Sequence, residues 1–406
     1  MNLVGAVTGP DWSLARRVLC VRLDNLGDVL MSTPAMRALH EQRPGRSLSL
    51  LTSPGGAALV PHLPFVDDAL VYDAPWVKNA RTAACDRGRD RALIEALAAR
   101  RFDAAVIFTV YSQSALPAAL TCLLAGIPLR LAYSRENPYA LLSDWAPETE
   151  PQVPPRHEVA RQLDLVARVG AATRDPRLVF TVDTRDRLHA QRRLRARGLL
   201  REDRPLVLVH PGASAPSRRY PPALFGAAID AIAALAPCSI ALTGNTDERE
   251  TIDAVLQATH APVQSLAGEL SLGELGATIG LASVLVSNNT GPVHLAAALG
   301  TPVVDLYALT NPQHTPWQVP HRLLYHDVPC RYCYRSVCPE THHDCLRQVP
   351  PAAVAAATID LLARRGDGID PPPLPAMPGA APRELALPAG RLGRHVYARQ
   401  QRRCPR

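Results

Sequence analysis

Two short turns that combine acidic or amide side chains with glycine carry the residue types most able to do chemistry in this chain. Residues 23–29 read LDNLGDV, and residues 287–300 read SNNTGPVHLAAALG. Each turn follows an apolar run and precedes an apolar helical pattern, which is where an α/β sheet exposes backbone N–H groups at a helix N-terminus. One such turn in each half of the sequence predicts two sheets that face each other across a cleft.

Asp28 is the carboxylate at the end of the first turn. A carboxylate at the rim of a cleft can act as a general base toward a hydroxyl group. The alternative is that Asp28 only caps the following helix, which the pattern predicts from Val29 to Gln42. The residues alone favour the cap.

Three further features suit an anionic ligand that contains a nucleotide. After a predicted strand, the loop PGASAPSRRYP carries Arg218 and Arg219, which can neutralise a diphosphate or simply lie in solvent. Thr290 and Gly291 precede a helix whose free N–H groups attract an anion, or they form a plain helix start. Glu248 follows another strand, where a carboxylate can bind a ribose or stabilise the dipole of its own helix.

Four cysteines lie within sixteen residues, with the spacing Cys330-x2-Cys333-x4-Cys338-x6-Cys345. Thiols at such spacing in a reducing compartment suit a structural zinc or iron ion. The alternative is a loop of reduced, partly buried thiols. Nine cysteines in a chain of this length argue against a disulfide scaffold.

The elements that must position these residues alternate between apolar strands and helical patterns, which is typical of a parallel sheet covered by helices. A proline-rich, acidic segment at 147–155 predicts a surface excursion, and the charged stretch 183–204 predicts the domain junction. The pattern predicts strands at 17–23, 47–52, 69–73, 103–108, 206–210, 239–243, 283–287 and 302–307, and a closing helix at 352–365. We expect an α/β protein with two Rossmann-like domains, 1–190 and 191–365, the second including a Cys-rich loop at 329–349, and a disordered tail at 366–406.

Composition narrows the function classes. The 406 residues suffice for two domains, and the net charge is +7, but no basic stripe is interleaved with aromatic residues, so nucleic acid is not an expected partner. The first ten residues lack a secretory pattern. The longest apolar stretch, at 116–129, contains two prolines and is too short to span a bilayer. These features predict a cytoplasmic protein.

In combination, the motifs resemble those of the glycosyltransferase family 9 heptosyltransferases of lipopolysaccharide core synthesis. The resemblance rests on GDVLMSTPA, HPGAS and TGPVHLAAALGTP in this order, and it runs from about Arg17 to Leu362. It implies the GT-B architecture, with two Rossmann-like domains around a cleft. It also implies inverting transfer of heptose from ADP-heptose to a hydroxyl of a glycan or glycolipid acceptor, without a catalytic metal or other cofactor.

The resemblance also implies roles for single residues. Asp28 matches the family's catalytic base, and Asn289 departs from the family pattern, which has an acidic residue at this position. An asparagine keeps the hydrogen-bonding shape of that acid but loses its charge. The matching donor-binding residues are Ser214, Arg218 or Arg219, Glu248, Asn289, Thr290, Gly291 and His294.

The acceptor side is less well marked. Arg135, Arg156 and His157 could meet acceptor phosphates or carboxylates, although ordinary surface charge is the favoured interpretation. The resemblance is compatible with peripheral contact with the cytoplasmic face of the inner membrane. Two other functions stay open: a sugar-nucleotide epimerase or hydrolase on the same fold, and a non-catalytic metal–thiolate scaffold. The retention of Asp28 together with the Thr290-Gly291-His294 set favours catalysis.

Overall fold

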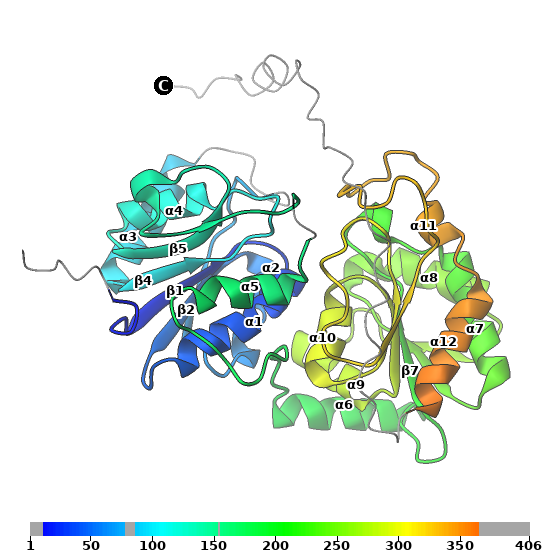
Figure 1. Ribbon diagram of the computed structural model, residues 1–406. Helices are drawn as coiled ribbons and strands as arrows, with labels where there is room; N and C mark the ends of the chain where they lie inside the picture. The colour runs from blue at the N-terminus through cyan, green and yellow to red at the C-terminus, as the bar shows by residue number, and fades with distance from the viewer. Residues whose placement is uncertain (1–10, 78–85, 153–154, 365–406) are drawn as a thin grey trace, which may run out of the picture. The chain divides into compact units, whose positions relative to one another are not determined.

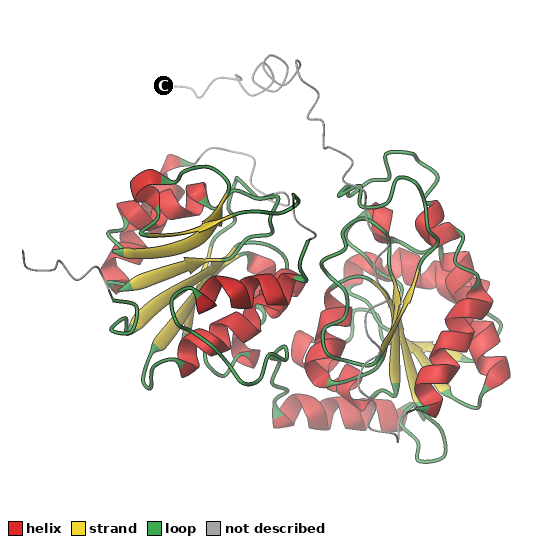
Figure 2. Cartoon of the chain, viewed as in Figure 1, coloured by secondary structure: helices red, strands yellow, loops and turns green. Residues whose placement is uncertain are grey.

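Two six-stranded parallel sheets form the framework of the protein, which is described here from a computed structural model for residues 11–77, 86–152 and 155–364 (Figure 2). The first sheet has the order β3-β2-β1-β4-β5-β6, and the second β12-β11-β10-β7-β8-β9. Counted from its own first strand, each sheet has the order 3-2-1-4-5-6 of a doubly wound dinucleotide-binding fold. The strands are β1 (Arg17–Arg22), β2 (Ser47–Thr52), β3 (Asp68–Val71), β4 (Ala104–Ile107), β5 (Leu129–Ser134), β6 (Asp144–Pro147), β7 (Leu206–His210), β8 (Ser239–Leu242), β9 (Val263–Ser265), β10 (Val284–Asn288), β11 (Val303–Leu306) and β12 (His321–Leu324).

Helices cover both faces of each sheet (Figure 1). In the first sheet, α3 and α4 lie on one face and α1, α2 and α5 on the other; in the second, α7, α8 and α12 lie opposite α9 and α10. The helices are α1 (Leu26–Glu41), α2 (Pro54–Ala57), α3 (Arg87–Arg100), α4 (Leu116–Leu124), α5 (Glu158–Ala167), α6 (Thr184–Ala196), α7 (Pro222–Leu235), α8 (Arg249–Ala258), α9 (Leu272–Leu281), α10 (Gly291–Leu299), α11 (Asp344–Arg347) and α12 (Pro351–Ala363), with single 3-10 turns at η1 (Val60–His62), η2 (Tyr139–Leu141), η3 (Pro216–Arg218) and η4 (Thr246–Glu248).

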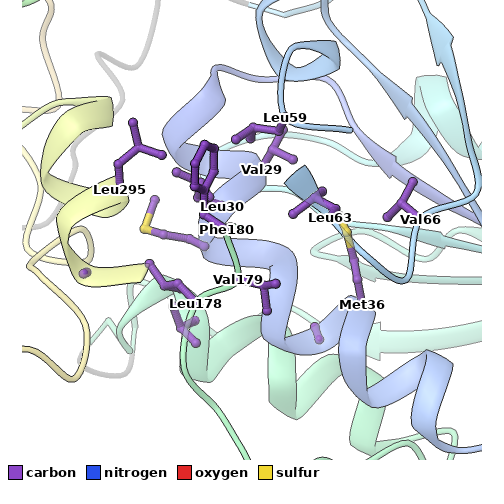
Figure 3. Close-up of a cluster of buried hydrophobic side chains, with 14 of the residues drawn as sticks. Val29, Leu30, Met36, Leu59, Leu63, Val66, Leu178, Val179, Phe180 and Leu295 are labelled. Atoms are coloured by element: carbon purple, nitrogen blue, oxygen red, sulfur yellow. The ribbon is translucent and has the colours of Figure 1, made fainter. Parts of the chain in front are cut away.

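Alternating strand residues fill apolar clusters on opposite faces of each sheet. Leu19 and Val21 of β1 belong to the cluster that includes α3 and α4, whereas Val18 and Cys20 belong to the cluster that includes α1 and α5. This second cluster continues into α9 and α10 of the other sheet. Figure 3 shows Leu30 of α1 and Leu295 of α10 within it. One continuous apolar cluster therefore holds elements of both sheets together.

The strand order fixes where a ligand can bind. In each sheet the chain winds in opposite directions from the central strand pair, which is β1 and β4 in the first sheet and β7 and β10 in the second. The crevice at such a switch point opens at the carboxyl ends of the strands. The turn at 23–25 follows β1, the loop at 211–221 follows β7, and the turn at 289–290 follows β10. Both glycine turns, and the loop at 211–221 that we call the arginine loop, thus leave the sheets at their switch points.

The eight predicted strands are confirmed to within two residues at each end, but four strands were not predicted. Three of these, β6, β9 and β12, are sheet edges, which bury less surface and therefore lack a continuous apolar run. The fourth, β5, is an inner strand that contains Arg130. That guanidinium is satisfied by main-chain carbonyls, including Leu141 O at 2.8 Å from Nε, a partner that the strand's own sequence does not reveal.

One local prediction was wrong, and a second was incomplete. The first helix begins at Leu26 rather than Val29, because Asn25 is its N-cap and Asp28 completes a capping box, accepting from Asn25 N at 3.2 Å. The described residues of the segment at 147–155 are mostly exposed or half-buried, as predicted, but one of its side chains is buried. Its Glu150 is fully buried and accepts hydrogen bonds from Arg156 Nε at 2.7 Å and Gln313 Nε2 at 2.9 Å.

The connection between the sheets runs through residues 178–182. Val179 N donates to Thr33 Oγ1 at 2.9 Å, whereas α6, the next element, packs on α9 of the second sheet. The domain boundary at 190/191 stays a prediction, and the tail at 366–406 lies outside the described residues. None of the helices in the described ranges has the length and apolar character needed to cross a membrane.

Candidate active site

A cleft of about 990 Å³ lies where the loops after the central strands meet. This volume is at the upper end of the range for small-molecule sites, roughly 300–1,000 Å³. Residues from both halves of the chain line the cleft, so a ligand can contact loops of both sheets. Its polar lining comprises Asp24, Asn25, Asp28, Ser53, Asp73, Thr109, Ser112, Gln113, Ser114, Ser214, Arg218, Thr310, Asn311, His314, Tyr334, Arg335 and Ser336.

Arg22, the last residue of β1, organises the acidic side of the cleft. Its guanidinium is fully buried and forms ion pairs with three carboxylates: Glu158 at 2.7 Å, Asp24 at 2.9 Å and Asp28 at 3.4 Å. Burial alone would lower the pKa of Arg22, but the three negative charges raise it above its usual value. One cation therefore holds three acids in place, and the cluster keeps an excess of negative charge.

The environment of Asp28 suits a proton acceptor. Burial raises the pKa of its carboxyl; the positive charge of Arg22 opposes this shift, Glu158 reinforces it and Arg218 opposes it. Burial likewise raises the pKa of Asp24 to about 6. A carboxylate with a raised pKa is a stronger base, so it is better matched to accepting a proton near neutral pH. Asp28 lies in the first turn of α1, and its side chain lines the cleft. The side chain is 17% exposed to solvent.

The loop after β7 separates the two candidate arginines. Arg218 lines the cleft, and none of the hydrogen bonds or ion pairs found in the described part of the chain engages its guanidinium. Arg219 instead donates from Nε to Ala213 O at 2.8 Å and does not line the cleft. Ser214, in the same loop, lines the cleft. Arg218 is thus available to a ligand, with no partner among the described residues, whereas Arg219 holds the backbone of the loop.

The two glycine turns, far apart in sequence, come into direct contact. A methyl group at Gly27 would lie 2.9 Å from Cδ2 of His294 and 3.8 Å from Cα of Gly291, so only glycine fits there without displacement. His294 is 4% exposed, and burial lowers its pKa well below the usual value, which keeps the imidazole neutral. His294, Thr290 and Gly291 pack behind the cleft rather than among the residues that line it.

Asn289 is buried at the end of β10, beside Asp305 of the neighbouring strand. Its Nδ2 donates to Asp305 Oδ2 and to His314 O, both at 2.9 Å. Burial raises the pKa of Asp305 to about 8, although the hydrogen bond from Asn289 and the charge of Arg218 lower it. The carboxyl is therefore protonated at neutral pH, and this strand end carries no net charge.

Glu248 lies at the end of η4, where it forms a capping box with Asn245. Its Oε2 accepts from Asn245 N at 3.0 Å and is 3.7 Å from His210 Nε2. The carboxylate packs directly on Gly212, where any side chain would overlap it. Glu248 is thus fixed by the β7 and β8 loops, but it does not line the cleft.

The three acceptor candidates have structural partners instead. Arg135 donates to Tyr111 O and Glu150 O, each at 2.9 Å. Arg156 pairs with Glu150 and Asp164, each at 2.7 Å. His157, which caps α5, is turned toward Thr315 O at 2.9 Å. None of these three residues lines the cleft.

The four clustered cysteines are free thiols that line one small cavity together with His342 and His343. Cys330 Sγ lies 3.8 Å from His342 Nε2. Burial raises the pKa of the Cys330 and Cys345 thiols, and each is raised further by the neighbouring cysteines. Among the described residues, however, no three potential ligands lie close enough together to hold an ion.

Sequence reasoning assigned no role to Arg22, Glu158, Asp305 or Arg335. Arg22 did carry a signal, because a charged residue that ends the apolar run VLCV must be paired if the strand is buried. The signal does not identify the partner, since Glu158 lies 136 residues away in sequence. Arg335 lies among the cysteines, whose spacing points to a metal rather than to the cleft.

Comparisons with known proteins show which family this chain is similar to. The model of glycosyltransferase family 9 (heptosyltransferase) matches residues 90–343, a span that begins after the Asp28 turn. Lipopolysaccharide heptosyltransferase 2 of Escherichia coli K12 is 24% identical over 320 residues, which cover 76% of this chain and 84% of the relative.

Two solved structures share the fold. A family 9 glycosyl transferase from Veillonella parvula superposes with a TM-score of 0.72 at 19% identity, covering 87% of this chain and 98% of the other. The E. coli ADP-heptose lipopolysaccharide heptosyltransferase II superposes with a TM-score of 0.65 at 23% identity, covering 86% and 99%. The two sheets therefore have the GT-B architecture, and this chain belongs to glycosyltransferase family 9, the heptosyltransferase family.

Proposed function

We propose that this glycosyltransferase moves a heptose or related sugar from an ADP-sugar to a hydroxyl of a lipopolysaccharide core or other glycan acceptor, with inversion. The observation that carries the proposal is one cleft lined by Asp28, a carboxylate of raised pKa, and by Arg218, a guanidinium with no ion-pair partner among the described residues. A base and a cation on one ligand space are what a displacement with an anionic leaving group requires. The E. coli ADP-heptose lipopolysaccharide heptosyltransferase II, which shares the fold, supports an ADP-sugar as the donor.

The proposed reaction is a one-step displacement. Asp28 takes the proton of the acceptor hydroxyl while the oxygen forms its bond to the anomeric carbon. The bond from that carbon to the diphosphate oxygen breaks on the opposite face, and ADP leaves with the electron pair. Arg218 stabilises the charge that develops on the diphosphate, which is usually the largest electrostatic contribution in such transfers.

The other matched residues act around this step in the proposal. Ser214 lines the cleft and binds the diphosphate, and Glu248 binds the ribose from the ends of β7 and β8. Asn289, Thr290, Gly291 and His294 shape the start of α10, whose free N–H groups attract an anion. Because Glu248 and these four residues do not line the cleft, their contact with the donor would require the loops to adjust on binding.

The proposal assigns residues 1–190 to the acceptor and 191–365 to the donor. It places the enzyme in the cytoplasm, with peripheral access to the inner membrane where a glycolipid acceptor would be met.

A separate proposal concerns the thiol cavity. We propose that Cys330, Cys333, Cys338 and Cys345 bind a zinc or iron ion, since four thiolates suit either metal. The shared cavity supports this proposal, while the spacing of the side chains implies that they must draw together around the ion. The ion would supply folding energy to a segment with little apolar core of its own.

The test of the catalytic proposal is Asp28→Asn. Asparagine keeps the shape of the side chain, so the fold and ADP affinity should be retained while kcat falls by roughly 10² to 10⁴. ADP affinity is measured by calorimetry and turnover by acceptor-dependent release of ADP. If the purified variant turns over at nearly the parental rate, Asp28 is not the base.

A further inference from the structure

The Cys-rich segment forms part of the wall of the active-site cleft. Tyr334, Arg335 and Ser336, which lie between the second and third clustered cysteines, line the same cleft as Asp28 and Arg218. The segment is therefore positioned to contact a substrate, in addition to any role of its thiols.

The backbone of this wall is bonded directly to the arginine loop. Ser217, which is buried and precedes Arg218, donates from its backbone N to Ser336 O at 2.9 Å. Its hydroxyl donates to Arg335 O at 2.7 Å. One serine thus fixes the main chain of Arg335 beside the main chain of Arg218.

The other side of the segment is held by Tyr334. Its backbone N donates to Thr310 O at 2.8 Å, and its ring packs edge-on against Tyr111 of the β4 loop, with centroids 5.5 Å apart. Tyr332 and Tyr334 have φ of +61° and +52°, a conformation that tyrosine adopts only where its surroundings hold it. The wall is consequently a defined structure and not a loosely attached loop.

Charge distinguishes Arg335 from the nearby Arg331. Arg331 is paired with Asp327 at 2.7 Å, whereas no acid in the described ranges pairs with the guanidinium of Arg335 or of Arg218. Two cations that lack an acidic partner in the described part of the chain, on adjacent and mutually bonded loops of one cleft, are suited to an oxyanion. A guanidinium binds phosphate or carboxylate oxygens in pairs, and such charge-assisted bonds are among the strongest available to a side chain.

We propose that Arg335 is a substrate-binding residue that contacts an oxyanion in the cleft together with Arg218. The oxyanion is either the diphosphate of the donor or an anionic group of the acceptor. The proposal deepens the proposed function and rests on it for the identity of the substrates. It also gives the Cys-rich segment a functional purpose, because the fold of that segment sets the position of Arg335.

The experiment compares Arg335→Ala, Arg335→Lys and a matched control, Arg347→Ala. Arg347 is exposed, lies in the same region of the chain and does not line the cleft. The probes are ADP and inorganic pyrophosphate by calorimetry, and the KM of a lipopolysaccharide core oligosaccharide with its phosphates intact or removed. Thermal unfolding confirms that each variant is folded.

Loss of Arg335 should weaken one of these interactions by roughly tenfold or more, as expected for a hydrogen bond to a charged group. Weaker binding of ADP and pyrophosphate identifies the donor diphosphate; a raised KM only for the phosphorylated oligosaccharide identifies the acceptor. Arg335→Lys should restore part of the loss, and Arg347→Ala should match the parent.

The proposal is overturned if Arg335→Ala equals the parent in every arm. Failure of the parent to bind ADP would count against the ADP donor, but pyrophosphate binding that depends on Arg335 would still support the oxyanion site. A parent that binds none of the probes would overturn both.

Discussion

Replacing Arg22 by glutamine should raise the pKa of Asp28 and so move the acidic limb of the pH–rate profile upward. The Arg22 guanidinium lies 3.4 Å from the Asp28 carboxylate. At an effective dielectric constant of about 20, two unit charges at this distance interact by about 5 kcal/mol. The Asp28 side chain keeps 17% of its surface, so water and salt screen part of this energy. Since about 1.36 kcal/mol corresponds to a tenfold change, even the unscreened part of this energy should move the acidic limb clearly to higher pH.

The sign follows from the role of Asp28. A general base works in its deprotonated form, so a raised pKa lowers kcat/KM at acidic and neutral pH and lets it recover at alkaline pH. The assay is acceptor-dependent ADP release between pH 5 and 9. Arg22→Lys is the matched control, because it keeps one positive charge but cannot reach all three carboxylates; its limb should lie between those of the parent and the glutamine variant.

The same substitution leaves Glu158 buried without its closest cation, although Arg161 stays near. Removing one partner of a buried ion pair costs about 3–5 kcal/mol, so the rates must be measured below the melting temperature of each variant. A folded glutamine variant whose acidic limb coincides with that of the parent would refute the reasoning. Either Arg22 does not control the proton affinity of Asp28, or Asp28 is not the base.

Three further predictions test other parts of the site. Arg218→Ala should weaken ADP binding by about 1.5–3 kcal/mol in calorimetry, whereas Arg219→Ala should not, because only the first side chain faces the cleft; equal effects would contradict the assignment. Burial raises the pKa of Asp24 to about 6, so its ionisation should remove up to about 3 kcal/mol of stability as pH rises from about 4 to 6. Urea unfolding of Asp24→Asn should lack this decline, and an unchanged profile would count against a buried Asp24. Protein purified without chelator should carry one zinc or iron ion per chain by elemental analysis, which Cys338→Ser should abolish; less than about a tenth of an equivalent would favour reduced thiols.

The sequence predicted the fold well because the inner strands are apolar on both faces. The buried runs of β1, β7 and β10 are continuous, and the glycine turns that follow them are local features. The edge strands β6, β9 and β12 gave no such signal, because one side of an edge has no neighbouring strand and its residues need not be apolar. The capping of α1 shifted its start because Asn25 and Asp28 both suit the cap, and only the backbone decides between them.

The site was predictable only where its chemistry is local. Asp28 and Arg218 could be nominated from their own turns, whereas the network around Arg22 depends on a partner in α5 that no spacing rule connects to β1. The separation of Arg218 from Arg219 likewise depends on which side chain reaches Ala213 O. For Arg135 and Arg156 the sequence left ligand binding open beside ordinary surface charge, because it does not show that both arginines bond to Glu150 in the proline-rich segment.

The Asn289 departure from the family pattern has a physical explanation in the neighbouring strand. An acid at this position would lie within hydrogen-bonding distance of Asp305, and two buried carboxyls this close cannot both ionise. With Asn289 the pair holds one carboxyl, and because burial raises the pKa of Asp305 to about 8, that carboxyl is protonated at neutral pH. The strand end beside the start of α10 is therefore free of negative charge. The partial positive charge of the helix N-terminus and the guanidinium of Arg218 then act on an anionic ligand without opposition from this buried pair.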